Sequence, residues 1–313
     1  MSQRSIFFYT ILGLILTTSC ERSKQNLIPE SNGANNESVV PQRELSEEFK
    51  SYWFDGTAEI TSYSLSQERY GELREGSMVA IFVTEDFDSE LQVKADSVAE
   101  GNIKVLKLNK TKKFLTGIYP YSIMSSIFSQ LDKQDHAIKV TNSVQEWCGQ
   151  VFAQLNNRDR YEINSYSYFQ SEADEQLELD KHWLEDELWN LIRINPESLP
   201  TGELKMIPSF EYSRLKHKNI DAYNAIASLK QGDSLSTYGV RYPDLQREII
   251  VYFNSSFPFE IEKWEETNAG WLGDTTRLKT TAVKMKRIKT PYWRQNSNKD
   301  SNLRDSLALD TSL

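Results

Sequence analysis

Two short runs, Met78–Thr84 (MVAIFVT) and Glu248–Phe253 (EIIVYF), decide the fold class of this chain. Both are rich in β-branched and aromatic residues, a composition typical of strands, and turn-forming residues separate them from their neighbours. Short strands joined by tight turns predict a mainly β fold, with a large curved antiparallel sheet or an open barrel. Similar runs recur outward in both directions, at Ala58–Leu65, Ile103–Leu108, Ala137–Asn142, Gly149–Leu155, Tyr161–Phe169, Glu203–Ile207, Phe259–Trp264 and Leu278–Ile288.

One segment, Ala173–Ile194, departs from the strand pattern. Its apolar residues recur at helical spacing beside a charged face, which predicts one amphipathic helix packed on the sheet. No repeat and no Gly- or Ser-rich boundary interrupts the strands. We therefore expect a single β-rich domain over residues 50–294 and a disordered tail over 295–313. The apolar residues of the predicted helix are Leu177, Leu184, Leu188, Leu191 and Ile192.

Composition excludes several classes of protein. Of the 313 residues, 39% are hydrophobic and 26% are charged, which fits neither a disordered chain nor a multi-span membrane protein. The net charge of -9 makes nucleic acid a poor partner. Two cysteines cannot build a disulfide framework, and neither has the spacing of a zinc ligand.

The N-terminus has the three regions of an export signal. Arg4 precedes an apolar run over residues 6–16 that is too short to span a bilayer, and small polar residues follow it up to Cys20. The segment resembles a bacterial lipobox, although Thr17 stands where that motif usually has Leu. The resemblance implies cleavage after residue 19 and attachment of acyl chains such as palmitate to Cys20. Two or three such chains hold a protein stably at a membrane.

Residues 20–49 have the composition of a flexible tether, rich in Asn, Ser, Glu and Pro. The residues just after Cys20 are mixed in charge and do not resemble the acidic run that directs some lipoproteins to the cell surface. We therefore expect a protein anchored by lipid in the outer membrane and facing the periplasm.

Local motifs for catalysis are missing from the sequence. It has no G-x-S-x-G nucleophile elbow and no glycine-rich phosphate loop, so we expect no catalytic residue and no cofactor. No histidine lies near Cys148 in the sequence, which predicts a buried, inert thiol. Aromatic residues crowd Ile118–Tyr121, Tyr161–Phe169 and Phe253–Trp264, where core packing is the expectation and a ligand-lined cavity the alternative.

Two acidic patterns resemble the beginnings of metal sites. His182 and Glu185 lie three residues apart on the predicted helix, but no third ligand accompanies them, so a solvated helix face is expected. Asp86, Asp88 and Glu90 begin as a calcium loop does, but the required glycine and the final glutamate are missing. We expect a solvated turn there and no metal.

The segment Arg277–Lys289 concentrates six basic residues in an acidic chain. Lysines on a strand usually mark a sheet edge that is protected against pairing with another chain, and this is the expectation. The alternative is a basic patch of Lys279, Lys284, Lys286 and Arg287 that meets anionic lipid headgroups or an acidic partner.

Several stretches together resemble a family of Bacteroidetes-type envelope lipoproteins that often carry the label septum formation inhibitor Maf. The resemblance spans most of residues 50–292. It implies no activity, because this family has none established and the Ser-x-Ser-Pro-Arg-Arg phosphate site of true Maf nucleotide pyrophosphatases has no counterpart here. The stretches are Arg69–Gly76, Thr116–Ser122, Gln145–Gly149, Leu155–Arg158 and Arg193–Pro196.

Two functions follow as hypotheses. The first is a non-enzymatic envelope lipoprotein that binds a lipid, peptide or protein, or acts as a structural module. The second is a hydrolase whose site is assembled across strands, with Glu146 or Glu72 as the carboxylate and Arg69 or Arg158 holding an anion. Because these charged residues lie in strand-like aromatic stretches, Arg69, Glu146 and Arg158 are the candidate ligand contacts.

Overall fold

The computed structural model describes residues 41–270 and 276–309 of the chain. These residues belong to one compact unit that begins at Val40. The predicted export signal, the predicted lipid attachment residue Cys20 and most of the predicted tether lie outside the described residues.

The described strands form one 16-stranded sheet. Two series of hairpins, β1 to β9 and β11 to β16, meet where β16 pairs with β1. The spatial order is β10-β11-β12-β13-β14-β15-β16-β1-β2-β4-β5-β6-β7-β8-β9, and β3 pairs with β2. The strands are β1 Ala58–Arg69, β2 Glu72–Asp88, β3 Val93–Lys94, β4 Asn102–Thr116, β5 Tyr119–Gln130, β6 Lys139–Glu146, β7 Gly149–Asn157, β8 Tyr161–Ser167, β9 Glu175–Leu179, β10 Trp183–Leu184, β11 Gly202–Ile207, β12 Tyr223–Lys230, β13 Leu235–Tyr242, β14 Arg247–Asn254, β15 Ile261–Thr267 and β16 Lys279–Thr290.

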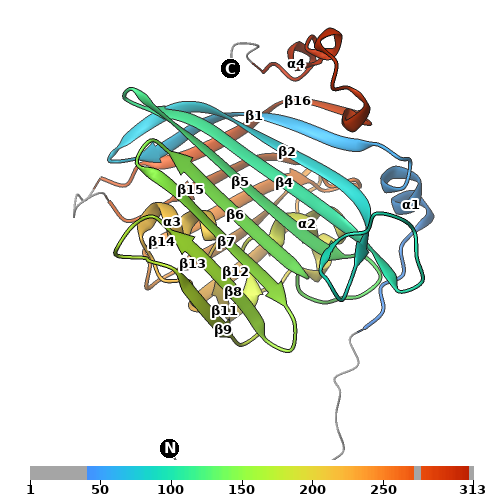
Figure 1. Cartoon of the computed structure of the whole chain (residues 1–313), viewed down its shortest axis with the longest axis horizontal. Coiled ribbons are helices and arrows are strands. Elements are labelled where there is room, and N and C mark those ends of the chain that lie inside the picture. Colours follow the sequence, from blue (N-terminus) through green and yellow to red (C-terminus); the bar gives the residue numbers. More distant parts are fainter. Residues whose placement is uncertain (1–40, 271–275, 310–313) are drawn as a thin grey trace, which may run out of the picture. The chain divides into compact units, whose positions relative to one another are not determined.

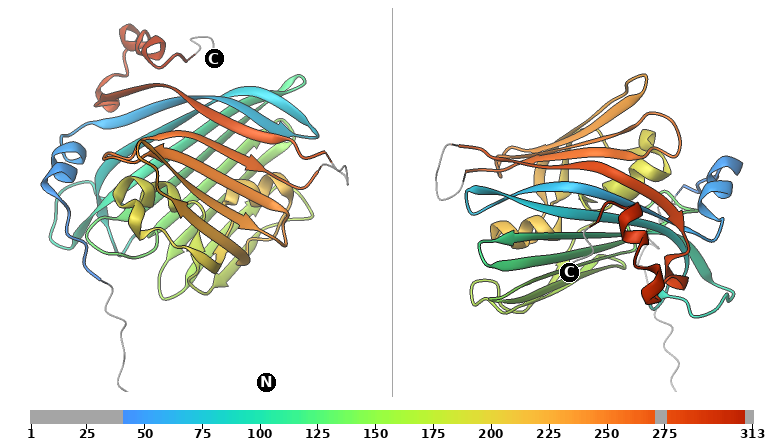
Figure 2. Two further views of the ribbon diagram at one scale, coloured as in Figure 1. Left: turned by 180° about the vertical axis from the view of Figure 1, so that it is seen from behind. Right: turned by 90° about the horizontal axis from the view of Figure 1, so that it is seen from above.

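The sheet curls on itself but stays open (Figures 1 and 2). Its two edge strands, β9 and β10, are separated by only three residues of sequence, yet they lie at opposite ends of the strand order and are not paired with each other. Neighbouring strands are antiparallel, except for the parallel pair β10 and β11. The prediction of a mainly β fold with a large antiparallel sheet or open barrel is confirmed.

Two short helices, α2 (Leu188–Ile194) and α3 (Phe210–Lys216), lie on the concave side of the sheet (Figure 2). Every residue of α2 is buried, and so is every residue of α3 except Lys216. The inward faces of the strands pack against them, as the alternating burial of β14 shows. The helices therefore fill the interior rather than covering the outside.

The predicted amphipathic helix over 173–194 is wrong in its first two thirds. Residues 175–179 form the edge strand β9, residues 183–184 form β10, and helix begins only at Leu188. Leu177 and Leu179 alternate with exposed residues, as a strand requires, and both pack on the core. Because α2 is buried on all sides, it has no solvent face from which an amphipathic pattern could arise.

The first hairpin turns at Tyr70 and Gly71, both with positive φ. Strand β2 begins at Glu72 and runs through Gly76. An added Cβ there would collide with the backbone carbonyl of Lys113 on β4, so the close approach of the two strands requires glycine.

The ordered body extends beyond both expected boundaries. At its start, Gln42 bridges to Lys133, Arg43 donates to the carbonyl of Gln130 at 3.0 Å, and helix α1 (Glu47–Trp53) follows. At its end, the expected tail instead forms helical turns, and Leu307 is buried beside Ser62 of β1, whose hydroxyl donates to the Leu307 carbonyl. These turns are η3 Tyr292–Arg294, η4 Asn298–Asp300 and α4 Leu303–Ser306.

Candidate functional site

Arg247 is the centre of a charged cluster inside the barrel. Its side chain is 1% exposed; Nη2 donates to Oε1 of Glu185 and Nε donates to Oε1 of Glu266, both at 2.7 Å. The Tyr242 hydroxyl donates to the other Glu185 oxygen at 2.8 Å. Burial opposes the charge of Arg247, but Glu185 and Glu266 outweigh it and raise the pKa of the guanidinium above its usual value. The cluster joins β14, β15 and the segment before α2 by paired charges.

A second cluster lies beside the first, where β4 faces α3. Lys112 Nζ donates to Oε1 of Glu211 at 2.5 Å, and Lys110 Nζ lies 4.0 Å from Oε2. Both clusters line one internal cavity of about 20 Å³. A buried water needs about 10–15 Å³, so this space holds about one water. This cavity therefore has no room for a lipid or peptide.

Asp186 is an incompletely satisfied carboxylate in this interior. It is 3% exposed, and its Oδ2 accepts from the backbone N–H of Phe210 at 3.2 Å. Its Oδ1 has no hydrogen-bond partner in the described chain. Burial raises the pKa of Asp186 from 3.8 to about 6, the nearby Glu185 adds to this, and Lys110 opposes it.

We expect Asp186→Asn to stabilise the protein at pH 8 by about 1–2 kcal/mol. The folded-state pKa of Asp186 lies above its unfolded value, so ionisation costs stability as the pH rises from 3.8 through about 6. The gain should therefore shrink towards pH 4, where the carboxyl is largely protonated. Urea unfolding of both proteins at pH 4, 6 and 8 measures it. A gain that is independent of pH, or a loss at pH 8, contradicts this account.

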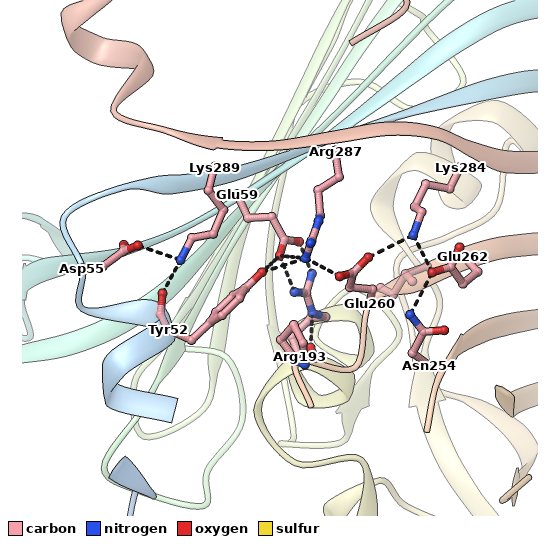
Figure 3. Close-up of polar contacts among 12 residues, drawn as sticks. Tyr52, Asp55, Glu59, Arg193, Asn254, Glu260, Glu262, Lys284, Arg287 and Lys289 are labelled. Atoms are coloured by element: carbon pink, nitrogen blue, oxygen red, sulfur yellow. Dashed lines mark hydrogen bonds and ion pairs between the residues drawn. The ribbon is translucent and has the colours of Figure 1, made fainter. Parts of the chain in front are cut away.

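A third charged network lies at the end of the barrel near α1 (Figure 3). Arg193 of α2 forms a two-pronged pair with Glu59 of β1, at 2.5 and 2.8 Å, and both side chains are 1% exposed. The guanidinium also lies 5.0 Å from the Trp53 ring and 4.7 Å from the Phe82 ring. Tyr52 and Arg287 contact the same Glu59 carboxylate. This network ties the buried helix to the sheet and to α1.

The prediction that the basic segment is a sheet edge is wrong. Strand β16 lies between β15 and β1 in the middle of the sheet. Its cations pair with acidic residues of β1 and β15 and with Glu260, the residue just before β15. The pairs are Lys279 with Glu265, Lys284 with Glu260 and Glu262, and Arg287 with Glu59 and Glu260.

The same ion pairs neutralise most of the charge of the alternative basic patch. Three of its four residues have carboxylate partners within the chain. Lys279 pairs with Glu265, and Figure 3 shows the pairs of Lys284 and Arg287. Lys286 is exposed and forms no ion pair with any described residue. The charges on β16 therefore serve mainly to hold neighbouring strands together.

The structure does not bring the candidate ligand residues together. Arg69 is 2% exposed and donates to the hydroxyls of Tyr70 and Tyr121 at 3.0 and 3.1 Å. Glu146 ends β6 and accepts from the backbone N–H of Cys148 at 2.7 Å. Arg158 lies beyond the opposite end of β7, with Nε 3.4 Å from Oε2 of Glu162.

The carboxylate and metal candidates are likewise dispersed. Glu72 pairs with Arg74 at 2.6 Å on the surface. Glu185 belongs to the buried Arg247 cluster, so the expected solvated helix face is wrong for it. Asp88 accepts from the backbone N–H groups of residues 90 and 91, as a solvated turn does. No group of three or more His, Cys, Asp or Glu side chains suited to a metal occurs in residues 41–270 and 276–309.

Cys148 is exposed, so the prediction of a buried thiol is wrong. It lies in the turn between β6 and β7, where a side chain can point into solvent. Glu146, through a hydrogen bond and its charge, raises the pKa of the thiol above its usual value. This disfavours the thiolate, the form that acts as a nucleophile.

The hairpin tips at one end of the barrel expose large apolar side chains. Leu115 and Ile118 flank the β4–β5 turn, Trp147 lies in the β6–β7 turn and Tyr168 follows β8; these residues are 58–82% exposed. The rings of Trp147 and Tyr119 lie 6.4 Å apart. The expectation of core packing is wrong for Ile118 and Tyr168. Ile118 follows Gly117 in the β4–β5 turn, and Tyr168 lies after the end of β8 and contacts Gly149. Clustered exposed apolar groups often mark an interaction surface.

Three hollows open at the surface of the described residues. One of about 120 Å³ lies between α3 and strands β7 and β8. Another of about 330 Å³ lies beside the C-terminal end of α3, and one of about 420 Å³ lies between η1 (Pro196–Ser198) and strands β12 to β14. These three hollows are large enough to hold a small ligand, whereas the internal cavity of about 20 Å³ is not.

Comparisons with known proteins give a structural likeness only. In the described residues, no helix is both long and apolar enough to cross a membrane. No family model matches the chain, and no curated protein matches its sequence. A crystal structure of a beta-barrel-like protein of domain of unknown function DUF1849 from Brucella abortus matches 74% of this chain and 98% of that chain, with 8% sequence identity and a TM-score of 0.45.

Proposed function

We propose that this protein is an envelope lipoprotein, anchored in the outer membrane through lipidated Cys20 and facing the periplasm, that acts as a non-enzymatic binding or structural module. The observation that carries the binding role is the packed interior. Its charges are largely paired within the chain, and its cavity of about 20 Å³ leaves no space for an internal cargo. Partners would therefore contact its outer surface, its hairpin tips or the surface hollows.

The membrane attachment rests on the sequence. A short apolar export signal ends at Cys20, and a tether rich in Asn, Ser and Glu separates that residue from the first described residue, 41. The resemblance to Bacteroidetes-type envelope lipoproteins supports the same location.

We expect Cys20→Ser to abolish membrane attachment in a bacterial host that processes lipoproteins. The wild-type protein should enter the detergent phase and have the mass of a diacylated or triacylated chain that begins at Cys20. The variant should stay in the aqueous phase, because no thiol is left to acylate. The exposed Cys148 provides the matched control, and Cys148→Ser should partition like the wild type. A wild-type protein without acyl mass, or a Cys20→Ser variant that stays in the detergent phase, would refute the anchor.

The binding role is tested in the same membranes. Crosslinking of the anchored protein, followed by mass spectrometry, should recover a partner through the exposed hairpin tips. Trp147→Ser should weaken the crosslink, since it removes an aromatic group that is 68% exposed. A pattern of crosslinks that is unchanged by the substitution would exclude these tips as the contact surface.

A further inference from the structure

Three neighbouring turns at one end of the barrel form a continuous apolar ridge. They join β4 to β5, join β6 to β7 and follow the end of β8, and strands β4 to β8 pair in that order. The rings of Tyr119 and Trp147 lie 6.4 Å apart, so the first turn lies beside the second. Tyr168 packs against Gly149, which places the third turn beside the second. We name the four side chains of these turns that are 58–82% exposed the tip ridge: Leu115, Ile118, Trp147 and Tyr168.

The turns of the tip ridge carry no charge. They read Leu-Thr-Gly-Ile over 115–118, Trp-Cys-Gly over 147–149 and Tyr-Phe-Gln over 168–170. The turn at the other end of β7 is the opposite case, because Arg158, Asp159 and Arg160 are all charged and exposed. Turns that face only water are usually built from small polar residues and glycine. The uncharged, apolar turns therefore indicate contact with an apolar partner.

The size of the tip ridge favours a bilayer over a protein as this partner. Its four side chains together expose roughly a few hundred Å², since one large aromatic side chain buries about 150–250 Å² when it is fully covered. A stable protein interface needs about 800 Å² on each partner. None of the three surface hollows described above includes a residue of the tip ridge, so they provide no pocket within it. A bilayer requires no complementary pocket, and Trp and Tyr are enriched where proteins meet the membrane surface.

The charges nearest to the tip ridge in the sequence indicate the kind of lipid. Lys113 precedes the first turn, Glu146 precedes the second and Glu172 follows the third, so two carboxylates accompany one cation. The whole chain is acidic as well, with a net charge of -9. Such a surface has no excess of positive charge to attract anionic headgroups. Association through the ridge therefore rests on its apolar side chains and suits zwitterionic lipid.

We propose that the tip ridge inserts into the headgroup region of a zwitterionic lipid bilayer. This inference deepens the binding role proposed for the hairpin tips, rests on it, and names lipid as the partner. It does not depend on acylation of Cys20, because described residues alone form the ridge. Insertion would orient the barrel, with the charged β7–β8 turn at the end away from the membrane.

The test uses the full-length protein, purified from a host that processes lipoproteins, in vesicles of phosphatidylethanolamine and phosphatidylcholine without other protein. Cys148 is exposed in the second turn, so a nitroxide on its thiol reports the surroundings of the ridge. Power-saturation EPR compares collisions of the label with oxygen, which enters bilayers, and with a water-soluble nickel chelate. Oxygen should dominate for the label at Cys148. The same label placed by Asp159→Cys in a Cys148→Ser background is the control, and there the nickel chelate should dominate.

A matched pair of substitutions tests the apolar contribution. Ile118→Ser should lower the ratio of inserted to water-exposed label at Cys148 at least about tenfold, because full burial of a large aliphatic side chain changes an equilibrium constant by about that factor or more. Val98→Ser is the control, since Val98 is 80% exposed and Ile118 is 82% exposed, but Val98 precedes the start of β4 whereas the ridge lies at its end. It should leave the ratio unchanged.

A Cys148 label that meets the nickel chelate as readily as the label at residue 159 overturns the proposal. Equal effects of Ile118→Ser and Val98→Ser, or insertion that requires added anionic lipid, also overturn it. Failure of the anchor is recognised separately, as missing acyl mass at Cys20, whereas failure of this inference is a Cys148 label that stays in water.

Discussion

Arg247→Met is expected to lower the free energy of unfolding by about 3–5 kcal/mol. The substitution keeps an apolar side chain of similar length against the Tyr212 ring, which lies 4.2 Å from the guanidinium carbon. It leaves Glu185, which is 2% exposed, with the Tyr242 hydroxyl in place of a cation. Breaking a buried pair in this way is costly, because one ion stays in the interior without compensation.

Urea unfolding followed by tryptophan fluorescence measures the loss due to Arg247→Met. Lys286→Met is the matched control, since it removes a cation that is exposed and unpaired in the described chain, and it should change stability by less than about 0.5 kcal/mol. A loss below about 1 kcal/mol for Arg247→Met would mean that water reaches Glu185 in the folded protein and that the interior is not packed as the structure indicates.

The strands were predictable because their signal is local. Runs such as Glu248–Phe253 have the composition of buried strands wherever they occur, and β14 covers that run. The position of β16 was not predicted, although the sequence contains a clue to it. Strand β15 and the residue before it are rich in glutamate, β16 is rich in lysine, and consecutive strands tend to pair. Complementary charge between successive segments therefore indicated a paired strand in place of an edge.

The interior could not be predicted from the sequence because its pairs are distant along the chain. Glu59 and Arg193 are separated by 134 residues, and Lys112 and Glu211 by 99. A charged residue in an apolar stretch is compatible with a surface face or with a buried pair, and only the fold decides between them. The same ambiguity made 173–194 resemble an exposed helix, although α2 is buried on every side.

The surface features were missed for a different reason. Trp147 and Tyr168 have the residue types of a core, so composition favours burial for both. They are exposed because they lie at or just after strand ends, where the chain turns away from the sheet. The hollow beside α3 depends on Ser213, Arg214 and Glu172, whose approach requires the loop after β8 to fold back on α3. No local pattern in the sequence encodes that approach.

Arg193→Met is the other substitution with a large expected effect, a loss of about 3 kcal/mol at pH 7. In the wild type, burial alone would raise the pKa of Glu59, but Arg193, Tyr52 and Arg287 together hold it below its usual value. The stability that this pair contributes is therefore present above the unfolded pKa near 4.5 and is lost as the pH falls through the folded pKa. Without Arg193, burial dominates and the pKa of Glu59 should rise instead.

Two results follow that a simple packing defect would not produce. The gap in stability between the wild type and Arg193→Met should narrow as the pH falls from 7 to 4, because protonation removes the uncompensated charge of Glu59. The double variant Glu59→Gln/Arg193→Met should be more stable than Arg193→Met alone by at least about 1 kcal/mol, since it removes the remaining buried charge. Urea unfolding of the wild type, Glu59→Gln, Arg193→Met and the double variant at pH 4 and 7 measures both quantities. If the two substitutions add and the gap is independent of pH, Glu59 and Arg193 are not coupled, and the network at this end of the barrel does not hold α2 in place.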